Sequence, residues 1–127
     1  MKRKSVVLLF SLALVLSAAT PLFAADTVVL RVLVVKTDDP GAYLKELDKG
    51  KALMKKLGAS AVIRVWRARF AGDNAGSTVV SVEYPSLAVM AKDEATVDAS
   101  PEYQTWFKGL DKLRTVVSDS LYTEMKP

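Results

Sequence analysis

The chain contains neither histidine nor cysteine among its 127 residues. Without them there is no Ser-His-Asp or Cys-His nucleophile, no zinc site built from His and Cys and no haem held by a protein His or Cys. Disulfide bonds are excluded as well. Oxygen-ligand metals need clustered carboxylates, and only Asp38-Asp39 and Asp93-Glu94 are adjacent acidic pairs. Helix capping accounts for such pairs more often than a metal does, so we expect no metal and no cofactor.

A hydrophobic run long enough to span a bilayer is also lacking. Residues 6–16 are apolar apart from one serine, whereas a membrane span needs roughly 18 or more apolar residues. This run follows basic residues at positions 2–4 and precedes a small residue, Ala24, which is the order of a secretory signal peptide. We therefore expect residues 1–24 to be a signal peptide and residues 25–127 to be a single domain, periplasmic or secreted, without membrane association after cleavage.

Positive and negative charges are nearly equal in number once the expected signal peptide is set aside. The whole chain has 18 basic and 14 acidic residues and a net charge of +4. Three of the basic residues lie at positions 2–4, so residues 25–127 carry 15 basic against 14 acidic residues. This balance gives no electrostatic reason to bind nucleic acid or an anionic membrane, and we expect neither partner.

The periodicity of the apolar residues predicts the order β-α-β-β-α-β, with the second helical segment split in two. Strands are expected at 27–36, 61–70, 77–84 and 121–125, and helices from Asp39-Pro40 to Gly58, over 87–95, and from Ser100-Pro101 with an apolar stripe that reaches Val117. Residues 71–76 form the loop of a hairpin. The order is that of an α+β, ferredoxin-like fold, with a four-stranded antiparallel sheet and helices on one face.

The face of this sheet that the helices leave uncovered should be polar, but it is not. Residues 30–35 are apolar on both faces apart from Arg31. A sheet that is apolar on both sides needs a second cover, and the simplest cover is another copy of the chain. We therefore expect a homodimer packed sheet to sheet.

The segment from Val80 to Leu110 resembles the dimeric α+β barrel proteins, which include antibiotic-biosynthesis monooxygenase-like and NIPSNAP-like domains. The resemblance lies in a strand that ends in Glu-Tyr, a Pro-Ser helix start and a Ser-Pro-Glu-Tyr helix start. The segment Val65-Trp66-Arg67-Ala68 and the glycine-containing loop after it are also similar to that group. The resemblance implies a homodimer whose two sheets form a barrel, with a pocket between sheet and helices in each subunit.

The activities of that group fit this chain only in part. The cofactor-independent oxygenases resemble one another in using Trp, Asn and Arg around an apolar pocket. This chain has Trp66, Trp106 and several arginines, but its only asparagine, Asn74, lies in the hairpin loop. The haem-degrading members use a His ligand, which is missing here.

One group of candidate site residues is charged. Arg31, Arg64 and Glu83 are expected together on the dimer-facing side of the sheet. They form either an anion or carboxylate pocket inside the barrel or a cross-strand ion pair that fixes the register or the dimer interface. This expectation assumes that Phe70 pairs near Ser77, which places Arg64 opposite Glu83.

A second group of candidate residues is aromatic, and the same register places its first member, Trp66, opposite Ser81. The group either lines a pocket for an apolar or aromatic ligand or packs as ordinary core. Its members are Trp66, Tyr84, Tyr103, Trp106 and Phe107.

Three functions stay open at this point. The first is an exported homodimer that binds a small apolar or aromatic molecule, and the second is a cofactor-independent monooxygenase or isomerase of the same fold. The third is a structural or interaction module whose barrel is filled with side chains. Whether the protein is an enzyme is not decided by these residues.

Overall fold

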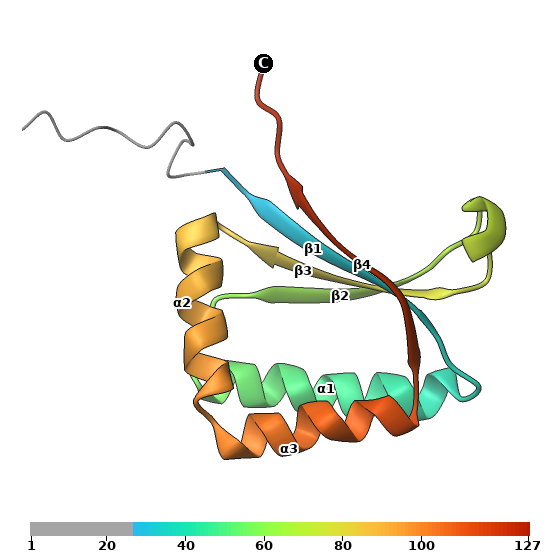
Figure 1. Cartoon of the computed structure of the whole chain (residues 1–127), viewed down its shortest axis with the longest axis horizontal. Coiled ribbons are helices and arrows are strands. Elements are labelled where there is room, and N and C mark those ends of the chain that lie inside the picture. The colour runs from blue at the N-terminus through green and yellow to red at the C-terminus, as the bar shows by residue number, and fades with distance from the viewer. Residues whose placement is uncertain (1–26) are drawn as a thin grey trace, which may run out of the picture.

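The computed structural model of the chain describes residues 27–127, so the predicted signal peptide and its cleavage site lie outside the described residues. The sheet is antiparallel, has the strand order β2-β3-β1-β4, and carries the helices on one face (Figure 1). This arrangement confirms the predicted ferredoxin-like α+β fold. The elements are β1 (Val29–Lys36), α1 (Pro40–Lys56), β2 (Val62–Arg67), a 3-10 turn η1 (Gly72–Asn74), β3 (Thr78–Tyr84), α2 (Leu87–Asp98), α3 (Pro101–Gly109), a 3-10 turn η2 (Leu110–Lys112) and β4 (Thr115–Thr123).

Each of the three helices begins at a residue whose side chain caps it. Asp39, Ser86 and Ser100 each accept a hydrogen bond from the backbone N–H three residues ahead, at 2.9, 3.1 and 3.2 Å. Such caps satisfy backbone donors that have no partner inside the helix. Pro40 and Pro101 occupy the first helical position, where a missing N–H costs nothing. The predicted helix starts are therefore confirmed.

The C-terminal strand begins earlier than the sequence pattern predicted. The apolar stripe suggested a helix that reaches Val117, but α3 ends at Gly109 and β4 starts at Thr115. Three consecutive β-branched residues, 115–117, favour a strand over a helix. Val116 pairs with Val35 in the neighbouring strand, next to an irregularity in the register of β1 and β4.

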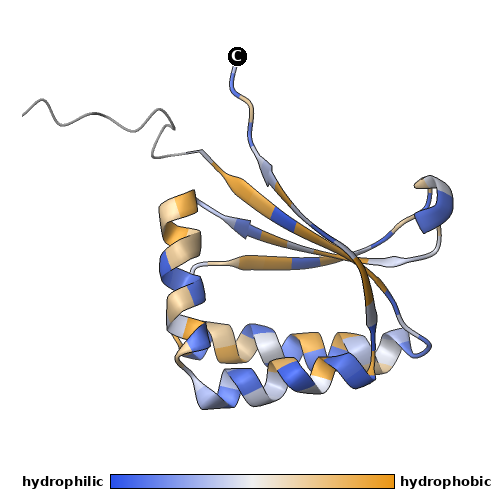
Figure 2. Ribbon diagram, viewed as in Figure 1, coloured by the Kyte–Doolittle hydropathy of each residue, from blue (hydrophilic) through white to orange (hydrophobic). Residues whose placement is uncertain are grey.

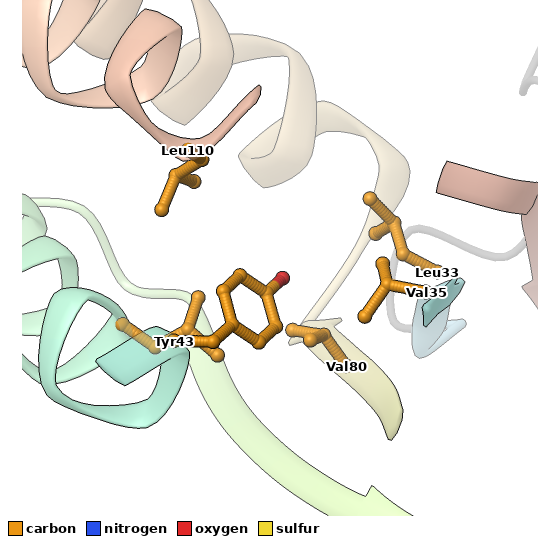
Figure 3. Packing of buried hydrophobic residues seen from close by; sticks show 6 residues of the cluster. Leu33, Val35, Tyr43, Val80 and Leu110 are labelled. Atoms are coloured by element: carbon orange, nitrogen blue, oxygen red, sulfur yellow. The ribbon is translucent and has the colours of Figure 1, made fainter. Parts of the chain in front are cut away.

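The core lies between the sheet and the helices. Figure 3 shows Tyr43 of α1 between Leu110 and Val80, with Leu33 and Val35 of β1 beside them. All five are buried, and Tyr43 and Val35 have no exposed surface. Apolar residues also occupy much of the sheet and the helices in Figure 2. No helix within residues 27–127 is both long and apolar enough to cross a membrane.

The register of the β2–β3 hairpin differs by two residues from the predicted one. Arg64 lies opposite Ser81 and Trp66 opposite Val79, so the expected pairs of Arg64 with Glu83 and of Trp66 with Ser81 are wrong as direct partners. Both pairs still meet diagonally, because a shift of two residues keeps each side chain on its face. Arg64 lies 3.3 Å from Glu83, and the indole N–H of Trp66 donates to the Ser81 hydroxyl at 2.8 Å.

The shift arises in the hairpin loop, which is longer than predicted. Ala68, and not Phe70, pairs with Ser77, since the Ala68 N–H donates to the Ser77 carbonyl at 3.0 Å. The turn η1 takes up the intervening residues and leaves Phe70 fully exposed.

Candidate functional site

The sheet separates the predicted charged cluster into two groups. Arg31 pairs in register with Val82, on the face that carries the buried Val80. Arg64 and Glu83 lie on the opposite face, which the helices leave uncovered and which we call the outer face. The expectation that these three residues lie together is therefore wrong. The strand alternation of β1 turns Arg31 towards the helices.

A cleft opens on the helix-facing side between α2, α3 and the sheet. It has a volume of about 370 Å³, and its walls include Arg31, Tyr84, Glu94, Tyr103 and Phe107. This size falls within the range of small-molecule sites, roughly 300–1,000 Å³. We call it the helix-side cleft.

The helix-side cleft adjoins a smaller inner cavity of about 70 Å³. Arg31, Tyr84, Tyr103 and Phe107 border both spaces. The inner walls are mostly apolar core residues, together with Trp106 and one further charged residue, Arg114. A ligand in the cleft would therefore meet a polar outer part and an apolar inner end.

Arg31 is neutralised by carboxylates. Its Nε and Nη2 donate to the two carboxylate oxygens of Asp119 at 2.9 and 2.7 Å, and Nη1 lies 3.5 Å from Glu94. The hydrogen bond to Asp119 outweighs burial and raises the pKa of Arg31 above its ordinary value. The same bond holds the pKa of Asp119 below its usual range. The forked geometry ties β1 to β4, and Glu94 adds a contact to α2.

Arg114 has a different environment. Its Nη1 donates to the hydroxyl of Tyr43 at 2.8 Å, and its guanidinium carbon lies 5.7 Å from the ring centre of Tyr43 and 5.6 Å from that of Phe107. Its Nε is buried without a hydrogen-bond partner. Within residues 27–127 no carboxylate forms an ion pair with this guanidinium, although its charge contributes to the lowered pKa of Asp119.

Two tyrosines give the cleft neutral hydroxyl groups. Burial, reinforced by the charge of Glu94, raises the pKa of Tyr84 to about 12. Burial also raises the pKa of Tyr103, with Asp98 as the next cause. Both phenols are therefore protonated at neutral pH and can donate or accept a hydrogen bond.

The aromatic wall of the cleft is built by α3. Tyr103 stacks on Phe107 with ring centres 6.0 Å apart and meets Trp106 at 5.4 Å. The indole N–H of Trp106 donates to the backbone carbonyl of Glu46 at 2.9 Å, which fixes α3 against α1. Such a wall presents flat apolar surface to a ring-shaped ligand.

The predicted aromatic group is brought together except for Trp66. Tyr84, Tyr103, Trp106 and Phe107 all border the helix-side cleft or the inner cavity. Trp66 lies on the outer face and is 53% exposed.

Arg114 is not among the predicted site residues, because the apolar stripe that reaches Val117 predicted a helix over this segment. Its partner Tyr43 lies 71 positions away, so no local pattern marks the contact. A basic residue directly before a β-branched run was the only available signal.

The adjacent acidic residues do not gather into a metal site. The Asp93 carboxylate is buried and accepts a hydrogen bond from the backbone N–H of Ser60 at 2.8 Å, whereas Glu94 faces Arg31. Among residues 27–127 there is no group of three or more potential metal ligands.

Comparison with known proteins gives relatives only through structure. No family model matches the sequence, and no curated protein matches it. A NIPSNAP family protein from Agrobacterium tumefaciens superposes with a TM-score of 0.61 at 13% identity, over 83% of this chain and 90% of that one. SnoaB, a cofactor-independent oxygenase from Streptomyces nogalater, gives a TM-score of 0.59 at 16% identity, over 80% and 96%.

A candidate antibiotic biosynthesis monooxygenase from Nitrosomonas europaea gives a TM-score of 0.55 at 16% identity, over 83% of this chain and 96% of that one. At these identities the likeness establishes the fold. It confirms, at that level, the resemblance to antibiotic-biosynthesis monooxygenase-like and NIPSNAP-like domains that the sequence predicted.

Proposed function

We propose that the protein is an exported homodimer that binds a small aromatic molecule in the helix-side cleft of each subunit. The observation that carries this proposal is the aromatic wall of α3 along a cleft of about 370 Å³, which shares wall residues with a smaller, mostly apolar cavity. A site of this kind combines flat apolar surface with a few polar groups that orient the ligand. Here Tyr84, Tyr103 and Arg114 supply the polar groups.

The binding proposal is tested with the protein purified gently from the exported fraction of cells that express the full chain. Native mass spectrometry detects any retained small molecule, and calorimetry measures binding of 2-naphthamide as a neutral aromatic probe. Gln104 lines the cleft, so Gln104→Trp should fill it and abolish binding. Thr105 is its exposed neighbour on α3, and Thr105→Trp should leave binding unchanged. Equal binding by both variants would place the ligand elsewhere. No retained molecule and no probe binding would favour the structural module.

The dimer forms, in this proposal, through the outer face. This face carries a broad apolar surface that no helix covers, and Trp66 and Tyr122 are 53% and 56% exposed on it. Its apolar members are Leu30, Val32, Val34, Val62, Trp66, Val79 and Tyr122. Contact between two such faces would remove these side chains from water, which is the main driving force of association.

Sedimentation of the purified protein tests the dimer. Trp66→Lys places a charge on the outer face and should shift the mass from two chains to one. Phe70→Lys changes a fully exposed aromatic residue in the hairpin loop, outside that face, and should stay dimeric. A wild-type protein that sediments as a single chain at micromolar concentration would overturn the dimer.

Export is part of the same proposal and depends on the first 24 residues. N-terminal sequencing of the protein from a cell fractionation should give Ala25 as the first residue. A protein that keeps Met1 and stays with the cytoplasm would contradict it.

A second candidate function is cofactor-independent oxygenation in the same cleft, with dioxygen as the oxidant. It is supported by the shared fold with SnoaB, which is an oxygenase of this type, and by Arg114, whose charge would stabilise a phenolate formed from the substrate. Oxygen consumption with a hydroquinone, measured above its uncatalysed oxidation, should then fall in Arg114→Gln. A rate equal to the uncatalysed one would leave binding as the function.

A further inference from the structure

The two guanidinium groups that border the inner cavity differ in whether a carboxylate of the protein pairs with their charge. Arg31 has a bidentate carboxylate partner in Asp119 and a second carboxylate, Glu94, at 3.5 Å. Arg114 has one hydroxyl partner, Tyr43, and two aromatic rings. Within residues 27–127 Arg114 is therefore a cation without a paired anion.

Such a cation is costly when it is partly removed from water. Contacts between the guanidinium and aromatic rings offset part of this cost, but the buried Nε of Arg114 has no acceptor. Asp38, Asp39 and Asp111 border a separate surface hollow together with Arg114. None of them forms an ion pair with it. A bound anion at this point would supply the missing charge.

The outer part of the cleft would not hold an anion. Asp93, Glu94 and Asp98 line it, and the positive charge of Arg31 is already used by Asp119. The guanidinium that has no ion-pair partner, that of Arg114, borders the inner cavity and lies beside Phe107. An acidic ligand would therefore enter with its charged group directed inwards.

We infer that the ligand of the helix-side cleft is an aromatic carboxylate and that Arg114, held against Tyr43 and Phe107, binds its carboxylate group. This inference rests on the proposed function, which places a small aromatic molecule in the cleft. The carboxylate accepts hydrogen bonds from the guanidinium, and the ring of the ligand lies along Tyr103 and Phe107. Arg114 thereby selects an acid over a neutral molecule of the same shape.

Calorimetry with two probes of nearly equal shape tests this selectivity. The probes are 2-naphthoate, which is ionised at neutral pH, and 2-naphthamide, which is neutral. A hydrogen bond to a charged group is worth about tenfold or more in affinity, so the wild-type protein should bind 2-naphthoate at least about tenfold more tightly. Arg114→Gln should lose this preference, so that the ratio of the two affinities falls to about one.

The matched control is Arg69→Gln, which removes one positive charge from the exposed hairpin loop outside the cleft. It should keep the full preference for 2-naphthoate. Arg114→Lys keeps the charge and loses the fork, so it should keep part of the preference. It also serves as the second variant if circular dichroism shows that Arg114→Gln does not fold.

Failure of the acidic-ligand inference and failure of the proposed function give different results in these experiments. Equal binding of both probes by the wild-type protein would overturn the acidic ligand and leave the proposed function standing. Loss of the preference in Arg31→Gln, with the preference kept in Arg114→Gln, would overturn the assignment to Arg114. Absence of binding by either probe would contradict the proposed function and, with it, this inference.

Discussion

Gly50 of α1 lies directly against the indole of Trp106 in α3, and replacing it with alanine should destabilise the protein. A Cβ at this position would lie 2.0 Å from Cζ2 and 2.3 Å from Cη2 of Trp106. Carbon atoms pack favourably at about 3.5–4.0 Å, so the indole or the helix would have to move by about 1.5 Å. The indole is not free to move without cost, because its N–H donates to the carbonyl of Glu46 at 2.9 Å.

The size of this destabilisation follows from contributions of opposite sign to the free energy of unfolding. Overpacking of a core costs about 1–3 kcal/mol, and loss of the Trp106 hydrogen bond costs about 1 kcal/mol. Alanine gains about 0.5–1 kcal/mol over glycine within a helix. The free energy of unfolding of Gly50→Ala should therefore fall by about 1–3 kcal/mol, which lowers the Tm of a domain of this size by at least about 4 °C.

Urea unfolding followed by circular dichroism measures this change. Gly109→Ala is the control, because Gly109 ends α3 with a φ of −63° and no atom lies within 4 Å of its added Cβ. The control should be as stable as the wild type or slightly more stable. In a Trp106→Leu background, which lacks the indole, Gly50→Ala should lower the free energy of unfolding only slightly. A Gly50→Ala protein with wild-type stability would refute the close contact between these helices.

Three further predictions concern ionisable groups. Burial raises the pKa of Tyr84 from 10.0 to about 12. Ionisation of this group should therefore leave the free energy of unfolding unchanged below about pH 10. Stability should then fall as the pH rises to about 12, by at most about 3 kcal/mol, and urea unfolding of Tyr84→Phe should show a smaller alkaline loss. The lowered pKa of Asp119 contributes stability at neutral pH that is lost as the pH falls through its folded-state value. Because the pair with Arg31 is partly exposed, Asp119→Asn should cost under about 1 kcal/mol at pH 7 and nothing in strong acid. Asp93→Ala removes the acceptor of the Ser60 N–H and should cost about 1–3 kcal/mol in urea unfolding, whereas Asp93→Asn, which keeps an acceptor, should cost less.

The sequence was sufficient for the elements that local chemistry determines. Asp39-Pro40 and Ser100-Pro101 specify helix starts through a capping side chain and a residue without an N–H, and both lie where they were expected. The expected place of Arg64 on the outer face is correct, and Trp66, two residues further along β2, lies on the same face. A period of two does not depend on the exact pairing.

The sequence was insufficient where the structure depends on contacts between segments that lie far apart in the chain. The pairing of β2 with β3 depends on how many residues the loop takes up, and the turn η1 was not evident from its composition. The stripe that ends at Val117 has helical spacing, but pairing of Val116 with Val35 places the segment in the sheet. Arg114 belongs to the candidate site only because α1 brings Tyr43 to it.

The same geometry makes ligand binding in the cleft and dimer formation through the outer face independent of each other. Arg114 lies on the helix-facing side of the sheet and Trp66 on the outer face, so no side chain serves both the cleft and the dimer face. Trp66→Lys should therefore alter the sedimenting mass with little change in the affinity for 2-naphthoate, and Arg114→Gln should do the reverse. If Trp66→Lys lost both the dimer and the ligand, the partner subunit would have to complete the cleft. The site would then belong to the assembly rather than to a single chain.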